Sequence, residues 1–199
     1  MRMRLTLALA TLAFSTGAFA QSDRFQVHYA ANLNIGDSYV DFTNTGAANG
    51  ANLCINLYTF DPAEELISCC SCTVTPNGLQ SLSVLKSLIS NPLTPAIPTA
   101  VVIKAVSSVG GACNPSTITP QQITASSGML AWGTTLHKNT STAAASYSVT
   151  ETAFSQAALS ESEFIHITTT CGFIQSNGSG FGICKGCAAG GLGASSSNQ

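Results

Sequence analysis

Three of the eight cysteines in this 199-residue chain, Cys69, Cys70 and Cys72, lie within four consecutive residues. Two more, Cys184 and Cys187, have CxxC spacing. Thiolates at such spacings can bind zinc or cuprous copper, and a CxxC pair at a helix N-terminus can exchange disulfides. Oxidised cysteines instead cross-link the chain. The choice among these chemistries depends on the compartment in which the protein works.

The first 20 residues have the pattern of a secretory signal peptide. Arg2 and Arg4 precede an apolar run over residues 5–14, and the sequence AFA at 18–20 matches a small-x-small cleavage site. Gln21 follows this site, where a lipoprotein would have a cysteine. No later segment offers about 18 uninterrupted apolar residues, so we expect no membrane insertion of the mature chain. The expected location is secreted: extracellular, periplasmic or at the cell surface.

The charge of the mature chain would be low and slightly negative. Residues 1–20 hold two of the seven basic side chains and none of the nine acidic ones. The remaining basic residues form no cluster, which argues against nucleic acid or an anionic membrane as a partner. Only 8% of the chain is charged, against roughly one quarter in average proteins. Ser, Thr, Asn and Gln must therefore supply most of the polar surface.

Alternation of apolar and polar residues predicts a long, half-buried strand at the mature N-terminus, over residues 25–35. The other face of this strand, with Gln26 and His28, would be solvated. The residues of the apolar face are Phe25, Val27, Tyr29, Ala31, Leu33 and Ile35. Further strands are expected at 39–43, 54–60, 65–75, 100–106, 128–137 and 147–154.

The connections are less regular than the strands. Residues 54–60 and 65–75 would form a hairpin around Pro62-Ala63. Residues 79–90 fit both a strand and a helix, and we favour a strand. The segment 91–100 contains three prolines and is expected to be an extended linker. Residues 110–127 are expected to form a long loop.

One amphipathic helix is predicted late in the chain, over residues 159–175. Ser160 and Glu163 can form its capping box. Its apolar stripe comprises Phe164, Ile167, Cys171 and Ile174. The sum of these elements predicts a mainly β fold: a single antiparallel β-sandwich-like domain over 21–187, stapled by disulfides, with a flexible tail at 188–199.

An even number of cysteines in an exported chain predicts up to four disulfides. In a strand, Cys70 and Cys72 share one face and Cys69 points to the other. The hairpin favours a bridge from Cys54 to Cys70 or Cys72, and Cys171 is near enough in sequence to pair with Cys184. The full set is Cys54, Cys69, Cys70, Cys72, Cys113, Cys171, Cys184 and Cys187. The alternative is a zinc or copper site built from the CCSC and CxxC cysteines.

The sequence offers no catalytic constellation. The three histidines, His28, His137 and His166, are dispersed and are expected to be solvated. No nucleophile elbow, zinc-protease helix, phosphate-binding loop or dinucleotide motif is present. We therefore expect neither an enzyme nor a cofactor, although residues far apart in sequence can still meet in space.

Five segments together resemble a group of uncharacterised exported bacterial proteins. They are YTFDP at 58–62, CCSC at 69–72, TPNG at 75–78, GMLAWGTTLH at 128–137 and NGSGFGIC at 177–184. The resemblance spans most of the mature chain. It implies a secreted bacterial protein and carries no activity with it.

The favoured function is a non-enzymatic structural or assembly protein of the cell surface or extracellular space. Its N-terminal strand, with Phe25, Val27, Tyr29, Leu33 and Ile35, could complete the sheet of another copy by strand addition. The same strand could instead pair within its own domain. The second hypothesis is an exported thiol- or metal-binding protein. The third is a module that binds a cell-surface carbohydrate or protein, with Trp132 and Tyr58 as contacts if both are exposed.

Overall fold

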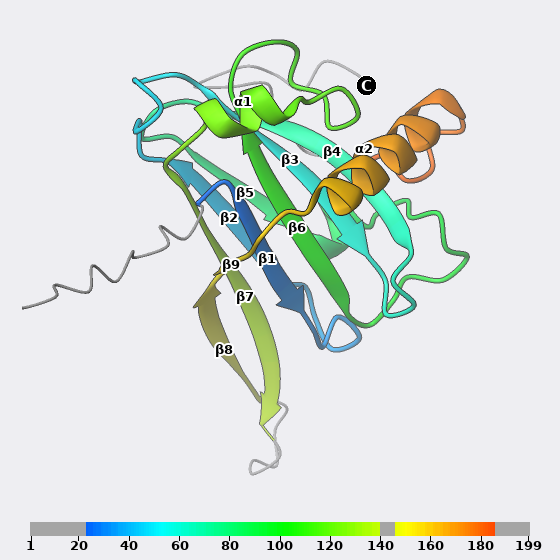
Figure 1. Ribbon diagram of the computed structural model, residues 1–199. Helices are drawn as coiled ribbons and strands as arrows, with labels where there is room; N and C mark the ends of the chain where they lie inside the picture. The colour runs from blue at the N-terminus through cyan, green and yellow to red at the C-terminus, as the bar shows by residue number, and fades with distance from the viewer. Residues whose placement is uncertain (1–22, 140–145, 186–199) are drawn as a thin grey trace, which may run out of the picture.

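A computed structural model describes residues 23–139 and 146–185 of the chain. The predicted signal peptide, Cys187 and the predicted tail lie outside the described residues. Two antiparallel sheets pack face to face, with one long helix late in the chain (Figure 1). The predicted fold class, a mainly β sandwich with disulfides, is confirmed.

The first sheet, sheet A, has the strand order β4-β3-β6-β1-β9. Its strands are β1 (Phe25–Ala30), β3 (Leu53–Phe60), β4 (Leu66–Val74), β6 (Val101–Ser108) and β9 (Ser155–Gln156). The second sheet, sheet B, has the order β5-β2-β7-β8. Its strands are β2 (Tyr39–Asn44), β5 (Leu79–Ser83), β7 (Met129–Asn139) and β8 (Ser146–Ala153). The helical elements are a π-helical turn at Val84–Leu88, α1 (Pro120–Ala125) and α2 (Glu161–Ser176).

Sheet A is covered on both faces. Its inner face packs against sheet B in the main core, which includes Phe42, Leu57 and Ile103. Its outer face packs under the helices in a second cluster that includes Tyr58 and Ile167. Because sheet A lies between two apolar layers, β3 is buried along its whole length.

The N-terminal strand is shorter than predicted, and its faces differ from the prediction. β1 ends at Ala30 because Asn32 adopts a left-handed conformation with φ 61°, which turns the chain. Gln26 and His28 point into the space between the sheets and are buried, whereas Tyr29 is 62% exposed. The expectation of a solvated Gln26 and His28 face was therefore wrong. The cause is the second layer, which buries the face that carries the polar residues.

Other segments refine the predictions. The ambiguous stretch 79–90 forms strand β5 and then the π-helical turn, so both patterns were present. The expected loop 110–127 contains α1, which the prediction missed. The hydroxyl of Thr119 accepts a hydrogen bond from the N–H of Gln122, and the Gln122 side chain completes a capping box. The hairpin of β3 and β4 is confirmed, with its turn held by Asp61.

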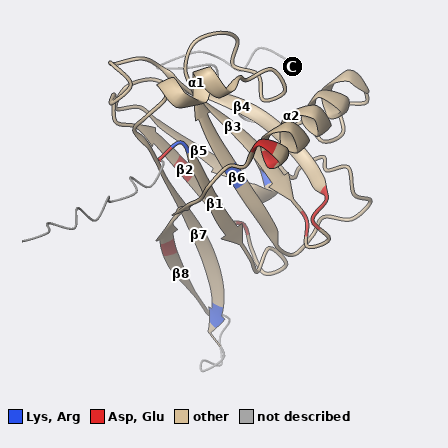
Figure 2. Ribbon diagram, viewed as in Figure 1, with Lys and Arg blue, Asp and Glu red and all other residues tan. Residues whose placement is uncertain are grey.

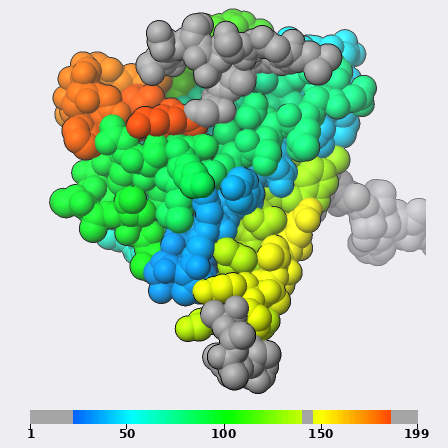
Figure 3. Space-filling model, turned by 180° about the vertical axis from the view of Figure 1, so that it is seen from behind, coloured from blue at the N-terminus to red at the C-terminus, as the bar shows by residue number. Residues whose placement is uncertain are grey.

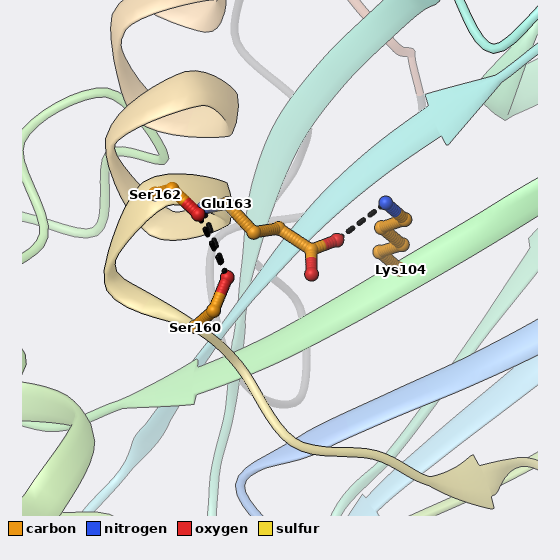
Figure 4. Close-up of polar contacts among 4 residues, drawn as sticks. All are labelled: Lys104, Ser160, Ser162 and Glu163. Atoms are coloured by element: carbon orange, nitrogen blue, oxygen red, sulfur yellow. Dashed lines mark hydrogen bonds and ion pairs between the residues drawn. The ribbon is translucent and has the colours of Figure 1, made fainter.

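Helix α2 is fixed to sheet A by polar contacts as well as by its buried stripe. The N–H of Glu163 donates to the Ser160 hydroxyl at 3.2 Å, which caps the helix. The Glu163 carboxylate does not complete the expected capping box but forms an ion pair with Lys104 of β6 (Figure 4). The Lys104 ammonium also lies 4.3 Å from the centre of the Phe60 ring. At the other end of α2, Ser116 donates to Gln175 at 2.6 Å.

Candidate functional site

The cysteines of the CCSC segment lie on β4 and are divided between the two faces of sheet A. Cys69 faces α2 and is bonded to Cys171, with their Cα atoms 6.0 Å apart. Cys70 faces the inter-sheet core and is bonded to Cys184, with a Cα separation of 5.4 Å. Cys72 shares the inner face with Cys70 and is also disulfide-bonded. The predicted division of these sulfurs between two faces is confirmed, and they staple the hairpin to different parts of the fold.

The predicted bridge from Cys54 to Cys70 or Cys72 was wrong. Cys54 lies opposite Thr73, so it shares the outer face of the sheet with Thr73 and not the inner face with Cys72. It is bonded instead to Cys113, in the loop that precedes α1. The predicted pairing of Cys171 with Cys184 was also wrong. Cys171 is bonded to Cys69 at the outer face of β4, whereas Cys184 is bonded to Cys70 at the inner face.

The disulfides determine what the sulfurs can do chemically. A zinc or copper site needs thiolates, and a bridged sulfur supplies none until it is reduced. Cys69 and Cys70 point to opposite faces of the sheet, so they cannot ligate one ion together even when reduced. Within residues 23–139 and 146–185, no group of three His, Cys, Asp or Glu side chains is arranged to hold a metal ion.

The histidines do not form a site with one another. His28 is 6% exposed and stacks on Phe154, with ring centres 4.7 Å apart. Burial lowers the pKa of His28 below its usual 6.5, because desolvation disfavours the charged imidazolium. His137 and His166 are exposed as predicted, and His137 Nε2 lies 2.9 Å from the Thr150 hydroxyl on the neighbouring strand.

A groove of about 460 Å³ lies between α1, the start of α2 and β1. Its walls include Phe25, Ile123 and Phe164, with Arg24 and Glu161 also among the lining residues. The residues that line it include no histidine or cysteine to act as base or nucleophile. The groove thus provides a surface of mixed character, in which Ser160 and Glu161 lie beside apolar side chains.

The two aromatic residues of the carbohydrate-binding hypothesis lie in different environments. Tyr58 is fully buried, and its hydroxyl donates to the Pro115 carbonyl at 2.6 Å. Burial raises the pKa of Tyr58 far above its usual 10. It cannot contact a ligand at the surface, so Tyr58 does not meet the condition of exposure on which that hypothesis depended. Trp132 is half-buried on the outer face of sheet B, opposite Asp41.

A long strand of the described chain, β8, is exposed over almost its whole length at one edge of sheet B. Seven of its eight residues are exposed and one is half-buried. Among the described residues it pairs only with β7, and the two strands extend beyond the body of the sandwich (Figure 1). Seen from behind, β8 lies at the margin of the molecule (Figure 3). Such an edge presents backbone N–H and C=O groups that can pair with another strand.

The other sheet edges in the described residues are partly covered or short. At β4, the N–H of Cys69 donates to the Gly182 carbonyl at 2.8 Å, and the N–H of Leu93 donates to the Ile67 carbonyl at 3.0 Å. At β1, strand β9 pairs with Gln26 and its neighbour. The remaining edge, β5, has five residues. Strand β8 is therefore the long open edge of the described structure.

The five residues proposed from the sequence for self-association do not form an exposed strand. Phe25 is buried under the helices, Leu33 lies in the inter-sheet core after the turn, and Tyr29 is exposed. Val27 and Ile35 are half-buried. β1 pairs with β6 of the same chain along all six of its residues. The period-two pattern of Tyr147, Val149 and Glu151 was the available signal for β8, but it indicated a strand and not an open edge.

Comparisons with protein-family models, with curated proteins and with solved structures give no match to this chain. None of the helices in the described ranges is long and apolar enough to cross a membrane. The disulfides indicate an oxidising, non-cytoplasmic compartment.

Proposed function

We propose that this chain is an exported structural or assembly protein without catalytic activity, which joins another polypeptide by strand addition at β8. The observation that carries the proposal is the edge of β8, eight residues long and open within the described residues, in a sandwich whose other edges are partly covered or short. Strand addition gives affinity through main-chain hydrogen bonds, and the side chains of alternate residues give specificity. The resemblance to exported bacterial proteins stays a prediction that agrees with this role.

The surface chemistry supports a role in assembly rather than in recognition of a polyanion. Charged residues are sparse over the described part of the molecule (Figure 2). β8 contains one charged residue, Glu151, and no proline. Natural edge strands that must stay single usually carry lysines, a proline or a bulge. An eight-residue edge without these protections is suited to a partner strand.

The N-terminal strand is a weaker site for the same function. Donation of residues 25–35 to another subunit would require β1 to leave β6 and to withdraw Phe25 and Leu33 from the core. Both are buried, and full burial of such a side chain contributes about 1.5–3 kcal/mol. Within the described residues, addition of a strand to β8 leaves the pairing of β1 with β6 and the burial of Phe25 and Leu33 intact. We therefore place the assembly surface on β8.

Chemical cross-linking on cells that export the protein tests the proposal. The variant Val149→Lys adds a charge to the β8 edge, and Leu79→Lys adds the same charge to β5 at the opposite edge of sheet B. The two side chains are 61% and 69% exposed, so neither change should disturb folding. We expect wild type and Leu79→Lys to form adducts heavier than the monomer, and Val149→Lys to lose them at an equal level of export. Adducts that persist in Val149→Lys, or none in wild type, would contradict the proposal.

Metal analysis and thiol alkylation of the same material test the main alternative. The proposed function predicts no free thiol before reduction. Bound zinc or copper together with several reactive thiols would favour the metal-binding hypothesis instead.

A further inference from the structure

We infer that the polypeptide added to β8 is the β8 of a second copy of this chain, antiparallel to the first about a two-fold axis at Val149. The inference rests on the proposed function and names its partner. Three features carry it: the direction of the backbone groups on β8, the side-chain pattern of the strand and the position of its single charge.

The hydrogen-bond pattern of the β7–β8 pair shows which backbone groups face the open edge. The N–H of Phe154 donates to the Ala131 carbonyl at 2.9 Å, and these two residues continue the register of the pair. They form a hydrogen-bonded pair, and such pairs alternate with non-hydrogen-bonded pairs along an antiparallel ladder. The N–H and C=O groups of Tyr147, Val149 and Glu151 therefore point away from β7.

The same three residues carry their side chains on one face of sheet B. Tyr147 and Val149 are 48% and 61% exposed there. Antiparallel pairing of two copies about an axis perpendicular to the sheet matches odd-numbered residues with odd-numbered residues. Outward backbone groups then meet outward backbone groups, and both outer faces stay on the same side. The two four-stranded sheets would become one continuous sheet of eight strands.

The charge of Glu151 selects the register. An axis at residue 151 would place the two Glu151 carboxylates directly opposite each other. An axis at residue 150 would make them diagonal neighbours, with Cα atoms about 7–8 Å apart. An axis at Val149 sets each Glu151 opposite the partner's Tyr147, about 14 Å along the strands from the partner's Glu151.

The Val149 register places no like charge beside Glu151 on the neighbouring strand. Lys138 of β7 lies opposite Tyr147 in the same chain. With Val149 at the axis, three side chains lie in a row across one face of the joined sheet. They are Glu151 of one copy, followed by Tyr147 and then Lys138 of the other copy. Lys138 is thus two strands away from Glu151, about 9–10 Å across the sheet, which is too far for an ion pair. Like charges directly opposite each other destabilise a sheet, and this register avoids them. An axis nearer the start of β8 would pair fewer of its eight residues.

Sedimentation velocity of the purified exported protein over a range of concentrations tests the inference. We expect a monomer–dimer equilibrium for wild type and for the control Leu79→Lys. Val149→Lys and Val149→Glu each place like charges opposite each other at the axis, so each should raise the dimer Kd by about tenfold or more. An equimolar mixture of the two variants should regain the dimer, because lysine then faces glutamate. Circular dichroism of each variant confirms that it is folded.

Each other result would overturn a stated part of the inference. A wild-type protein that stays monomeric at all concentrations would exclude a second copy as the partner. If cross-linked adducts on cells were still lost in Val149→Lys, the proposed function would stand with a different partner. Dimers that survive Val149→Lys would exclude the β8 edge. A mixture that remains monomeric would exclude the axis at Val149.

Discussion

Replacement of Gly133 by alanine is the sharpest test of how the two sheets fit together. Gly133 lies on the inner face of β7, and a Cβ there would come within 2.1 Å of His28 Nε2 and 2.5 Å of two ring carbons. The ring cannot retreat freely, because its face stacks on Phe154 at 4.7 Å. Overpacking of this kind costs about 1–3 kcal/mol. The lower backbone entropy of alanine offsets about 0.5–1 kcal/mol, so we expect a net loss of about 1–2 kcal/mol in the free energy of unfolding.

The same substitution should have the opposite sign when the ring is absent. In a His28→Ala background, the Cβ at position 133 meets no imidazole, and only the backbone gain of about 0.5–1 kcal/mol remains. Urea unfolding of the four proteins of this double-mutant cycle, with disulfides intact, measures both effects. A Gly133→Ala protein as stable as wild type, or the same loss in both backgrounds, would refute the close packing of His28 on β7.

Three further predictions concern other parts of the chain. Burial lowers the pKa of His28 in the folded state, so the free energy of unfolding should fall as the pH drops from 6.5 towards that lower pKa, and should not depend on this group above pH 6.5. Urea titrations at several pH values should show that His28→Ala removes this loss of stability at acidic pH. Six cysteines form the three bridges above and Cys72 is also bonded, so peptide mapping of the unreduced protein should join Cys72 to Cys187, and a free thiol at Cys187 would contradict this. Thr119→Ala removes the cap of α1 and should destabilise the protein by about 1 kcal/mol in urea unfolding, whereas Thr119→Ser should not.

Local patterns in the sequence predicted the strands and the late helix, because each depends on short-range periodicity. The hairpin of β3 and β4 followed from two apolar runs and the turn at Asp61. Its disulfide did not follow, because the pairing depends on register. The prediction set Cys54 opposite Cys70 or Cys72, and the true partner is Thr73. A shift of one residue moves a side chain to the other face of the sheet.

Burial of the individual faces depends on layers that the sequence does not display. The alternation in β1 marked two faces correctly, but the polar face with Gln26 became an interior face when sheet B covered it. The Gln26 amide then found a buried acceptor, the Met129 carbonyl, at 2.8 Å. The same reasoning explains why the open edge of β8 was missed. A strand pattern with Tyr147 and Val149 on one side is identical whether or not another strand pairs with its edge.

The bridge between Cys70 and Cys184 has a structural consequence beyond chain entropy. It fastens the segment ending at Cys184 along β4, where the N–H of Cys69 donates to Gly182 and the Cys69 carbonyl accepts from the N–H of Cys184. The disulfide thereby helps to cover part of one edge of sheet A, and β9 covers Gln26 and Val27 at the other edge. Because an uncovered edge can pair with another strand, this partial cover of sheet A leaves sheet B as the site of the association proposed above. Within the described structure, one long edge then remains, and its single charge limits the registers in which two copies can pair.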